Sequence, residues 1–269
     1  MKSSLLNLGC GNRFNPAWTN VDIISRDPLV IAHNLRFGIP FETNSFDMVY
    51  HSHVLEHLTV EDGRKFIAEC FRVLRPGGIL RVSIPDLEDI ARNYIIELDK
   101  VSAGNINAKP DHQWMSIELL DQLARNSTGG EMGKFLTQEY LPNEKFVYSR
   151  IGEEARNFRE VYFRNKTACT CPRIQRMRRA IREFFKKMLP SKIRKALQIG
   201  LFRTGGEVHQ WMYDHISLAS LLEENGFTDV LRMGVADSYL PSWSEYELDA
   251  TKEGVLIRPH SLIMEARKR

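Results

Sequence analysis

Cysteine is scarce in this chain, with four among 269 residues, and no two of them are spaced as a C-x-x-C pair. Cys10 and Cys70 stand alone, while Cys169 and Cys171 are separated by one residue. No cysteine and histidine array has the spacing of a zinc site, so the sequence predicts no metal site. It also excludes a disulfide scaffold, and reduced cysteines are typical of a cytoplasmic protein.

Long apolar runs are missing as well. No segment approaches the roughly 18 to 20 consecutive apolar residues of a membrane span. Residues 1–10 superficially resemble a lipoprotein signal, but their apolar stretch is shorter than the roughly 7 to 15 residues of a true signal. We therefore expect an unprocessed protein that works in the cytoplasm.

The chain does have a short apolar segment that runs into a glycine turn. Residues 5–8 lead into Gly9 and Gly11, and Asp22 follows at the end of the next apolar segment. Glycines let backbone N–H groups approach a ligand closely, and a carboxylate at the adjacent strand end can accept hydrogen bonds from ribose hydroxyls. This arrangement predicts a site for a cofactor that contains adenosine.

The third glycine of the dinucleotide-binding pattern is absent. Phe14 stands at that position of G-x-G-x-x-G, and Asp22 comes earlier than the acid expected about 20 residues further on. Without that glycine a helix cannot pack closely beneath a pyrophosphate. The turn therefore favours S-adenosylmethionine, which carries adenosine without a diphosphate, over nicotinamide or flavin dinucleotides.

Strand patterns alternate with helical ones along the chain, which predicts a parallel, doubly wound α/β sheet. A helical stripe over 60–74 ends at the proline and glycines of 75–78, and a second helix covers 217–224. The predicted strands cover residues 4–8, 19–23, 29–32, 46–51, 78–84, 227–234 and 262–266.

The first half of the predicted sheet has no room for ordinary crossover helices. Only residues 12–20 and 24–28 separate the first three strands. One face would therefore lack its helical cover, although parallel sheets normally have both faces buried. We expect the long segment 92–206 to fold over that face, or a second subunit of a homo-oligomer to cover it.

Several strings of the sequence form a recognisable set: NLGCG, NVDI, FDMVYHSHVLEHL, FRVLRPGGILRVSIPDLEDI, HQWMYDHISLASLLEENGF and HSLIMEARK. Together they resemble the class I S-adenosylmethionine-dependent methyltransferases, in particular a bacterial subgroup associated with cell-surface polysaccharide synthesis. The resemblance implies a Rossmann-like sheet of order 3-2-1-4-5-7-6 with its last strand antiparallel. It also implies a cofactor-binding core over 1–91 and 207–269 and a long, mainly helical insertion over 92–206, after the fifth strand.

The same resemblance implies the residues that contact S-adenosylmethionine. Asn7 stands where many relatives have an acid that orders the glycine loop, and Asn34 stands where many have an aspartate that meets the adenine amino group. The full implied set is Asn7, Leu8, Gly9, Cys10, Gly11, Asp22, Asn34, Leu35, His51 and Ser52.

Catalysis of methyl transfer needs few groups. The reaction is an in-line displacement, so most of the acceleration comes from alignment, and a base is needed only for a hydroxyl or a protonated amine. We predict His53 and Asp86, after the fourth and fifth strands, and His209 as catalytic candidates. Asp86 can instead cap the helix that follows it. The string around His209, HQWMYD, offers the polar and aromatic groups of an acceptor pocket.

Segment 173–203 is strongly basic, with eleven basic residues and a single acidic one. Its apolar residues recur at helical spacing and most cations fall on the opposite face. The segment can pack on the domain as a solvated helix, rest on an anionic membrane surface or bind nucleic acid. Its aromatics lie on the apolar face rather than among the cations, which makes nucleic acid unlikely as a partner.

These observations predict a methyltransferase that uses S-adenosylmethionine. We expect it to act on a sugar hydroxyl of a surface polysaccharide or of its lipid-linked precursor, with peripheral contact at the inner membrane face through 173–203. One alternative is an N- or O-methyltransferase of another small molecule. The other is a cofactor-binding protein without turnover that serves as a partner in a synthesis complex.

Overall fold

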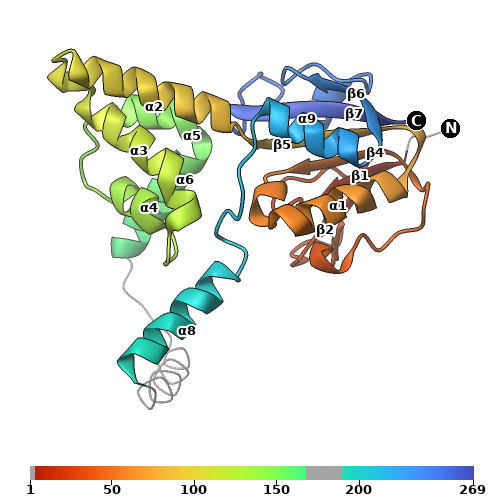
Figure 1. Ribbon diagram of the computed structural model, residues 1–269, viewed down its shortest axis with the longest axis horizontal. Coiled ribbons are helices and arrows are strands. Elements are labelled where there is room, and N and C mark those ends of the chain that lie inside the picture. Colours follow the sequence, from red (N-terminus) through yellow and green to blue (C-terminus); the bar gives the residue numbers. More distant parts are fainter. Residues whose placement is uncertain (1–3, 168–189) are drawn as a thin grey trace.

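The computed structural model of the chain describes residues 4–167 and 190–269. Within that part, seven strands form one sheet in the order β3-β2-β1-β4-β5-β7-β6, which confirms the predicted order (Figure 1). Strands β1 to β5 are parallel, and β7 pairs antiparallel with both β5 and β6. The strands are β1 (Leu5–Leu8), β2 (Thr19–Asp22), β3 (Val30–Ala32), β4 (Phe46–Ser52), β5 (Leu74–Pro85), β6 (Phe227–Arg232) and β7 (Ser261–Lys268).

Helices α1 (Val60–Val73) and α9 (His215–Glu224) cover one face of the sheet with aliphatic side chains. Ile67 of α1 and Leu218 of α9 are fully buried in the same core as Leu6. The predicted end of the first helix is confirmed, since α1 ends at Val73 and Gly77 has a φ angle of 79°. The fifth strand begins earlier than the predicted residue 78, because Leu74 already pairs with Phe46 and a register shift follows before the regular ladder.

Aromatic side chains cover the opposite face. Trp18 packs edge-on against Trp243, with ring centroids 5.9 Å apart, and Tyr50 of β4 lies 5.2 Å from the same indole. Trp243 belongs to η4 (Trp243–Tyr246), in the connection between β6 and β7. The expectation that segment 92–206 covers this face was therefore wrong. The β6–β7 connection covers it, because it carries the large aromatic rings that the missing crossover helices would otherwise provide.

The insertion builds a helical layer beside the sheet with its own core around Trp114 and Met115, both fully buried (Figure 1). The insertion starts immediately after β5, where Asp86 caps its first helix. Ile90 of this helix is buried in the insertion core. The helices are α2 (Leu87–Ser102), η3 (Ile106–Ala108), α3 (Lys109–Ala124), α4 (Gly130–Leu136), α5 (Glu144–Ile151) and α6 (Glu153–Thr167).

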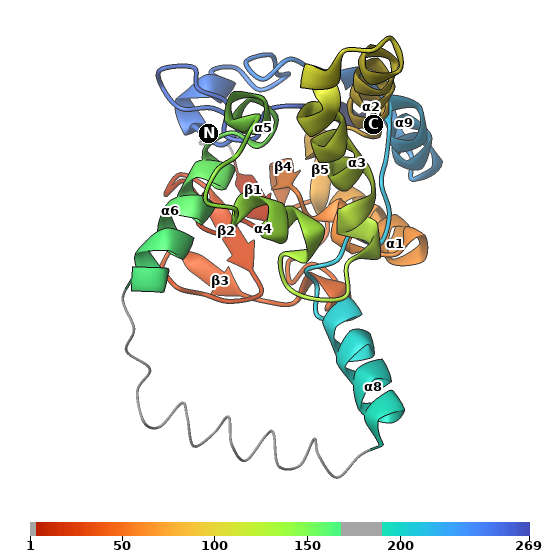
Figure 2. The same ribbon diagram turned by 90° about the vertical axis from the view of Figure 1, so that its left-hand side faces the viewer.

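Helix α8 (Ser191–Arg203) extends away from both layers, and none of its residues is buried (Figures 1 and 2). It holds the last part of the basic segment 173–203. The earlier part, 173–189, lies outside the described residues, as do Cys169 and Cys171. Among the residues that the structure describes, no helix is long and apolar enough to cross a membrane.

Candidate active site

Both glycines of the turn after β1 adopt a backbone conformation that favours glycine. Gly9 and Gly11 have φ angles of 65° and 53°, in the left-handed region. Gly9 N donates to Val21 O at 2.8 Å, which brings the turn back against β2. A Cβ atom at Gly9 would overlap the side chain of Val54, whereas one at Gly11 would meet nothing within 4 Å. Gly11 therefore leaves its side-chain position open to a ligand.

Two polar side chains hold this turn in place. Asn7, which is 1% exposed, donates through Nδ2 to the carbonyl oxygen of Arg13 at 3.1 Å and to Asn20 Oδ1 at 3.2 Å. Asp22 Oδ2 accepts a hydrogen bond from Gly11 N at 2.8 Å. Asn7 thus orders the turn as a donor from beneath, and Asp22 fixes it from the neighbouring strand end.

A cavity of about 1110 Å³ opens beside the turn. Among the residues predicted to contact the cofactor, five line it: Asn7, Gly9, Cys10, Gly11 and Ser52. Its second wall is helix α6, and its third wall is the end of the β6–β7 connection, from Leu248 to Arg258. Figure 2 shows α6 on the side of the sheet where β1 and β2 lie.

Sequence reasoning missed the α6 wall of this cavity. Asn157, Phe158, Val161 and Tyr162 line it, and they recur at the spacing of one helix face. That periodicity was the available signal. It could not show what the face meets, because the glycine turn lies far away in the sequence.

Other predicted cofactor residues lie outside the lining of this cavity. Leu8 and His51 are fully buried, and the His51 ring packs against Phe66 with centroids 5.0 Å apart. Burial lowers the pKa of His51 to about 4. Asn34 caps η1 (Leu35–Phe37) by accepting from Arg36 N at 3.1 Å, and Leu35 packs against the aliphatic core.

Asp22 and Asn34 nevertheless share one edge of the sheet. Asp22 does not line the cavity, but it pairs in register with Ala32, two residues before Asn34. The ends of β1, β2 and β3 therefore lie next to one another, with the glycine turn at the first of them.

His53 stands directly after β4 with a φ angle of 55°, which is uncommon for a residue with a side chain. Its Nδ1 lies 3.0 Å from Glu56 Oε1, and its Nε2 lies 3.0 Å from Ser261 Oγ. Burial raises the pKa of Glu56, but interactions with His53, and with His209 and His57 in their protonated forms, together outweigh it and lower the value to about 2. Burial lowers the pKa of His53 itself, which favours its neutral form. We therefore assign the proton of neutral His53 to Nδ1, facing the carboxylate, with Nε2 as the acceptor.

His209 reaches the same place from the segment after α8. His209 N donates to Gln122 O at 3.0 Å, and Gln210 N donates to Glu56 O at 2.7 Å. These bonds place the His209 ring edge-on against His57, with centroids 4.8 Å apart. Burial lowers the pKa of His209 to about 3, so the imidazole is neutral at pH 7.

These histidines and Glu56 line a second cavity, of about 330 Å³. His53, Glu154 and Arg258 line both cavities, so the two adjoin at His53. The lining of the smaller one is rich in polar and charged groups: His53, Glu56, His57, Glu118, Gln122, Arg125, Arg150, Glu154, Glu207, His209, Arg258, His260 and Ser261.

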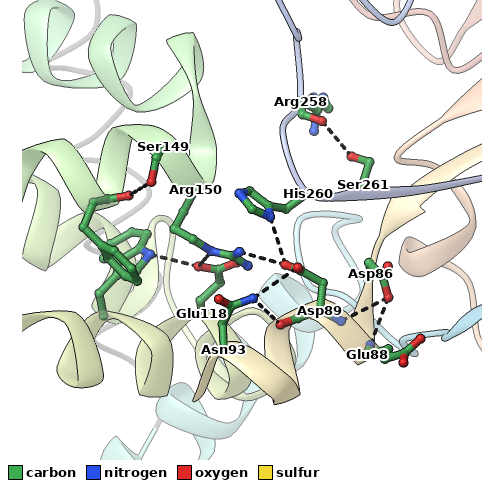
Figure 3. Close-up of polar contacts among 12 residues, drawn as sticks. Asp86, Glu88, Asp89, Asn93, Glu118, Ser149, Arg150, Arg258, His260 and Ser261 are labelled. Carbon is green, nitrogen blue, oxygen red and sulfur yellow. Dashed lines mark hydrogen bonds and ion pairs between the residues drawn. The ribbon is translucent and has the colours of Figure 1, made fainter. Parts of the chain in front are cut away.

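Asp86 lies elsewhere. It accepts hydrogen bonds from Glu88 N and Asp89 N as the cap of α2 (Figure 3). Its Oδ2 lies 2.7 Å from Arg232 Nη2. It is 2% exposed and lines neither cavity. The structure therefore brings His53 and His209 together around Glu56 and places Asp86 at a helix end.

An ion-pair network ties the insertion to the sheet beside the smaller cavity (Figure 3). Arg150 of α5 contacts Glu118 at 2.6 Å and Asp89 at 2.7 Å, and His260 Nδ1 lies 3.1 Å from the same Asp89. Burial raises the pKa of Asp89, but hydrogen bonds from His260 and Arg150 outweigh it and lower the value to about 2. This network positions the two layers that form the cavity walls.

A comparison with known protein families matches part of the sheet. Residues 25–82 match a family described as a methyltransferase domain, over a segment that contains β3, β4, α1 and the first part of β5. The match lies within the seven-stranded sheet, whose order 3-2-1-4-5-7-6 is that of a Rossmann-like α/β fold.

Individual relatives match parts of the chain. It is 35% identical over 100 residues to a probable S-adenosylmethionine-dependent methyltransferase of Mycolicibacterium smegmatis, covering 30% of this chain and 38% of that protein. It is 52% identical over 42 residues to an uncharacterized protein of Haemophilus influenzae, covering 16% and 17%. The chain thus spans well under half the length of these curated relatives.

Among solved structures, the Burkholderia thailandensis 1,6-didemethyltoxoflavin-N1-methyltransferase, with bound S-adenosylhomocysteine, is 12% identical. It has a TM-score of 0.40, over 99% of this chain and 71% of that one.

Proposed function

We propose that this chain is a methyltransferase that uses S-adenosylmethionine as methyl donor. The observation that carries the proposal is the large cavity, which begins at the glycine turn and ends at His53, where the smaller polar cavity adjoins it. The methyltransferase-domain match over 25–82 and the strand order support it independently.

The residues at the sheet edge fit such a cofactor. A side chain at Gly11 would project into the open space beside the turn, so glycine there leaves room for a ligand. Asp22 can accept hydrogen bonds from ribose hydroxyls, and the Asn34 amide can meet the adenine at the same edge. Cys10 and Ser52 line the cavity between the turn and His53.

When bound, S-adenosylmethionine would supply a methyl group on a sulfonium, which is transferred in line to an acceptor oxygen as the carbon–sulfur bond breaks and the neutral thioether leaves. His53 is placed to take up the hydroxyl proton at Nε2, because Glu56 already holds the proton on Nδ1. Ser261 Oγ also lies 3.1 Å from the Arg258 carbonyl, so its hydroxyl proton keeps an acceptor when Nε2 is protonated. Glu56 then faces the resulting imidazolium at 3.0 Å.

For the acceptor we propose a sugar hydroxyl of a surface polysaccharide or its lipid-linked precursor. Carboxylates, guanidinium groups and imidazoles around the smaller cavity offer the hydrogen-bond partners that a polyhydroxyl ligand needs. The resemblance to polysaccharide-associated enzymes supports the same choice.

We also propose that helix α8 brings the chain to an anionic membrane surface. Ile193, Leu197 and Leu201 are each more than half exposed, at 54%, 51% and 63%, and they recur at helical spacing. Lys192, Arg194 and Lys195 add positive charge near the N-terminal end of this helix. An apolar stripe flanked by cations suits the headgroup region of an anionic bilayer.

Three measurements test these proposals. Calorimetry with S-adenosylmethionine tests donor binding, and transfer of a radiolabelled methyl group to a cell-envelope extract distinguishes an enzyme from a binding protein without turnover. Donor binding without any transfer to glycans, small molecules or lipids would contradict the enzyme. Sedimentation with anionic and neutral vesicles tests α8, and binding that ignores both lipid charge and salt would contradict the membrane proposal.

A further inference from the structure

Three side chains near His53 converge on one point of the smaller cavity. Glu56, His57 and His209 each offer one ligand atom, and these atoms all lie within 4.8 Å of one another. Glu56 and His57 belong to η2 (Leu55–His57), and the backbone bond from Gln210 N to Glu56 O fixes His209 opposite them. A zinc ion binds nitrogen and oxygen ligands at roughly 2.0 to 2.2 Å, so its ligands lie within a few ångströms of one another, as these atoms do.

The polar atoms of this cluster lack partners. Among the described residues, Glu56 Oε2, His57 Nδ1 and His209 Nδ1 are buried without a hydrogen bond. Glu56 is 1% exposed and His209 is 6% exposed, so bulk water does not satisfy them. Buried polar atoms in native proteins nearly always have a partner. Three orphan groups around one point therefore indicate a ligand that all of them contact.

We propose that Glu56, His57 and His209 bind a divalent transition-metal ion of the zinc type. One carboxylate and two imidazoles form the protein ligand set of open zinc sites, in which a fourth position is left to water or substrate. Imidazole ligands favour such an ion over Mg²⁺, which prefers oxygen donors.

The surroundings of the cluster suit a bound cation. His53 Nδ1 lies 3.0 Å from Glu56 Oε1, and metal-binding carboxylates are commonly held by such an outer hydrogen bond. Arg125 also lines the cavity, but Asp121 at 2.9 Å and Glu207 at 3.5 Å balance its charge. A cation would in turn balance the buried charge of Glu56.

The site deepens the proposed function and in that respect rests on it. The ion would face the 330 Å³ cavity that adjoins the larger one at His53. When bound, the ion would supply Lewis-acid polarisation of an acceptor hydroxyl in this cavity. His53, beside the cluster, would take up the hydroxyl proton.

The experiment uses the full chain after removal of metal with a chelator. Calorimetric titration with Zn²⁺ should show one equivalent bound, and Co²⁺ should give the visible absorption of a low-symmetry site. The variants Glu56→Gln and His209→Ala should each weaken Zn²⁺ binding by more than about 10-fold. His215→Ala is the matched control, because His215 lies outside the cluster and contacts Glu88 at 2.8 Å. It should bind Zn²⁺ as the unaltered chain does.

Circular dichroism and thermal unfolding show whether each variant folds. If His209→Ala fails to fold, the near-isosteric Glu56→Gln still tests the site. Zn²⁺ binding that is absent, or equal in the folded variants and the unaltered chain, would overturn the site. Calorimetry with S-adenosylmethionine is run separately. If the chain binds one Zn²⁺ through the cluster but does not bind S-adenosylmethionine, the metal site stands and the proposed function is wrong.

Discussion

The two adjoining cavities are built in different ways. One side of the larger cavity comes from a short local motif, the turn from Gly9 to Arg13, whose glycines and hydrogen bonds shape it within a few residues. The cluster in the smaller cavity exists because backbone bonds from His209 and Gln210 bring a late segment against Gln122 and Glu56. The proposed donor site therefore depends on local backbone geometry, whereas the proposed acceptor site depends on how the insertion packs on the sheet.

His53 is where the two cavities meet, so its replacement should have the largest effect. His53→Gln removes the proton acceptor and should lower the rate of methyl transfer about 10²- to 10⁴-fold. The dissociation constant of S-adenosylmethionine should stay within about twofold, because the donor is held mainly by the turn. Single-turnover kinetics and calorimetry measure the two quantities. Equal losses in both would show that His53 supports donor binding instead.

Breaking the wall of the smaller cavity should have the next largest effect. Arg150→Met leaves the buried Glu118 without its cation and the half-buried Asp89 with His260 alone, and should lower the free energy of unfolding by about 3 to 5 kcal/mol. Arg92→Met is the matched control, because its pair with Glu88 is exposed and should contribute less than about 1 kcal/mol. Chemical denaturation measures both. Similar losses in the two variants would mean that the network does not hold the layers together.

The donor side is tested by Asp22→Asn. This change weakens the acceptor for Gly11 N and for ribose hydroxyls, so the affinity for S-adenosylmethionine should fall about 10- to 100-fold. Zn²⁺ affinity should not change, since the cluster lies in the other cavity. Asp27→Asn, which affects only a local bond to Leu29 N at 2.8 Å, is the control. An unchanged donor affinity in Asp22→Asn would remove this carboxylate from the site.

The smallest effect concerns pH. The pKa of Asp89 is lowered from 3.8 to about 2, so its ionised form stabilises the folded state above pH 4. That contribution is lost as the pH falls from about 4 to 2. Asp89→Asn should therefore cost about 1 to 2 kcal/mol at pH 7 and progressively less below pH 4. Urea unfolding of both proteins at pH 7 and pH 3 measures the difference, and a constant gap would contradict the assignment.

Sequence reasoning recovered what local patterns encode. Apolar periodicity and turn residues placed the seven strands along the chain, the family resemblance implied their order, and the two glycines and Asp22 marked one end of the larger cavity. It also named His53 and His209, but it did not see that Glu56 joins them or that His57 completes a ligand cluster. That juxtaposition depends on two segments that no sequence spacing relates.

The cover of the second sheet face was misjudged for a similar reason. The short crossovers showed that a helix was missing, but not which distant segment replaced it. Trp243 and Tyr246 lie in a connection with no long periodic stretch, and their role becomes visible only when they meet Trp18. The walls contributed by α6 and by Leu248 to Arg258 were missed on the same grounds.

Two walls of the larger cavity differ in how firmly they are packed: the β6–β7 connection is held against the sheet, whereas helix α6 is not. Asp249 holds the connection against the sheet through Tyr50 Oη at 2.6 Å and Arg81 at 2.8 Å, both buried. Helix α6, in contrast, buries only Ala155 among its described side chains. Ligands should therefore enter and leave by displacement of α6. Amide hydrogen exchange should be faster there than in β4, and donor binding should slow it.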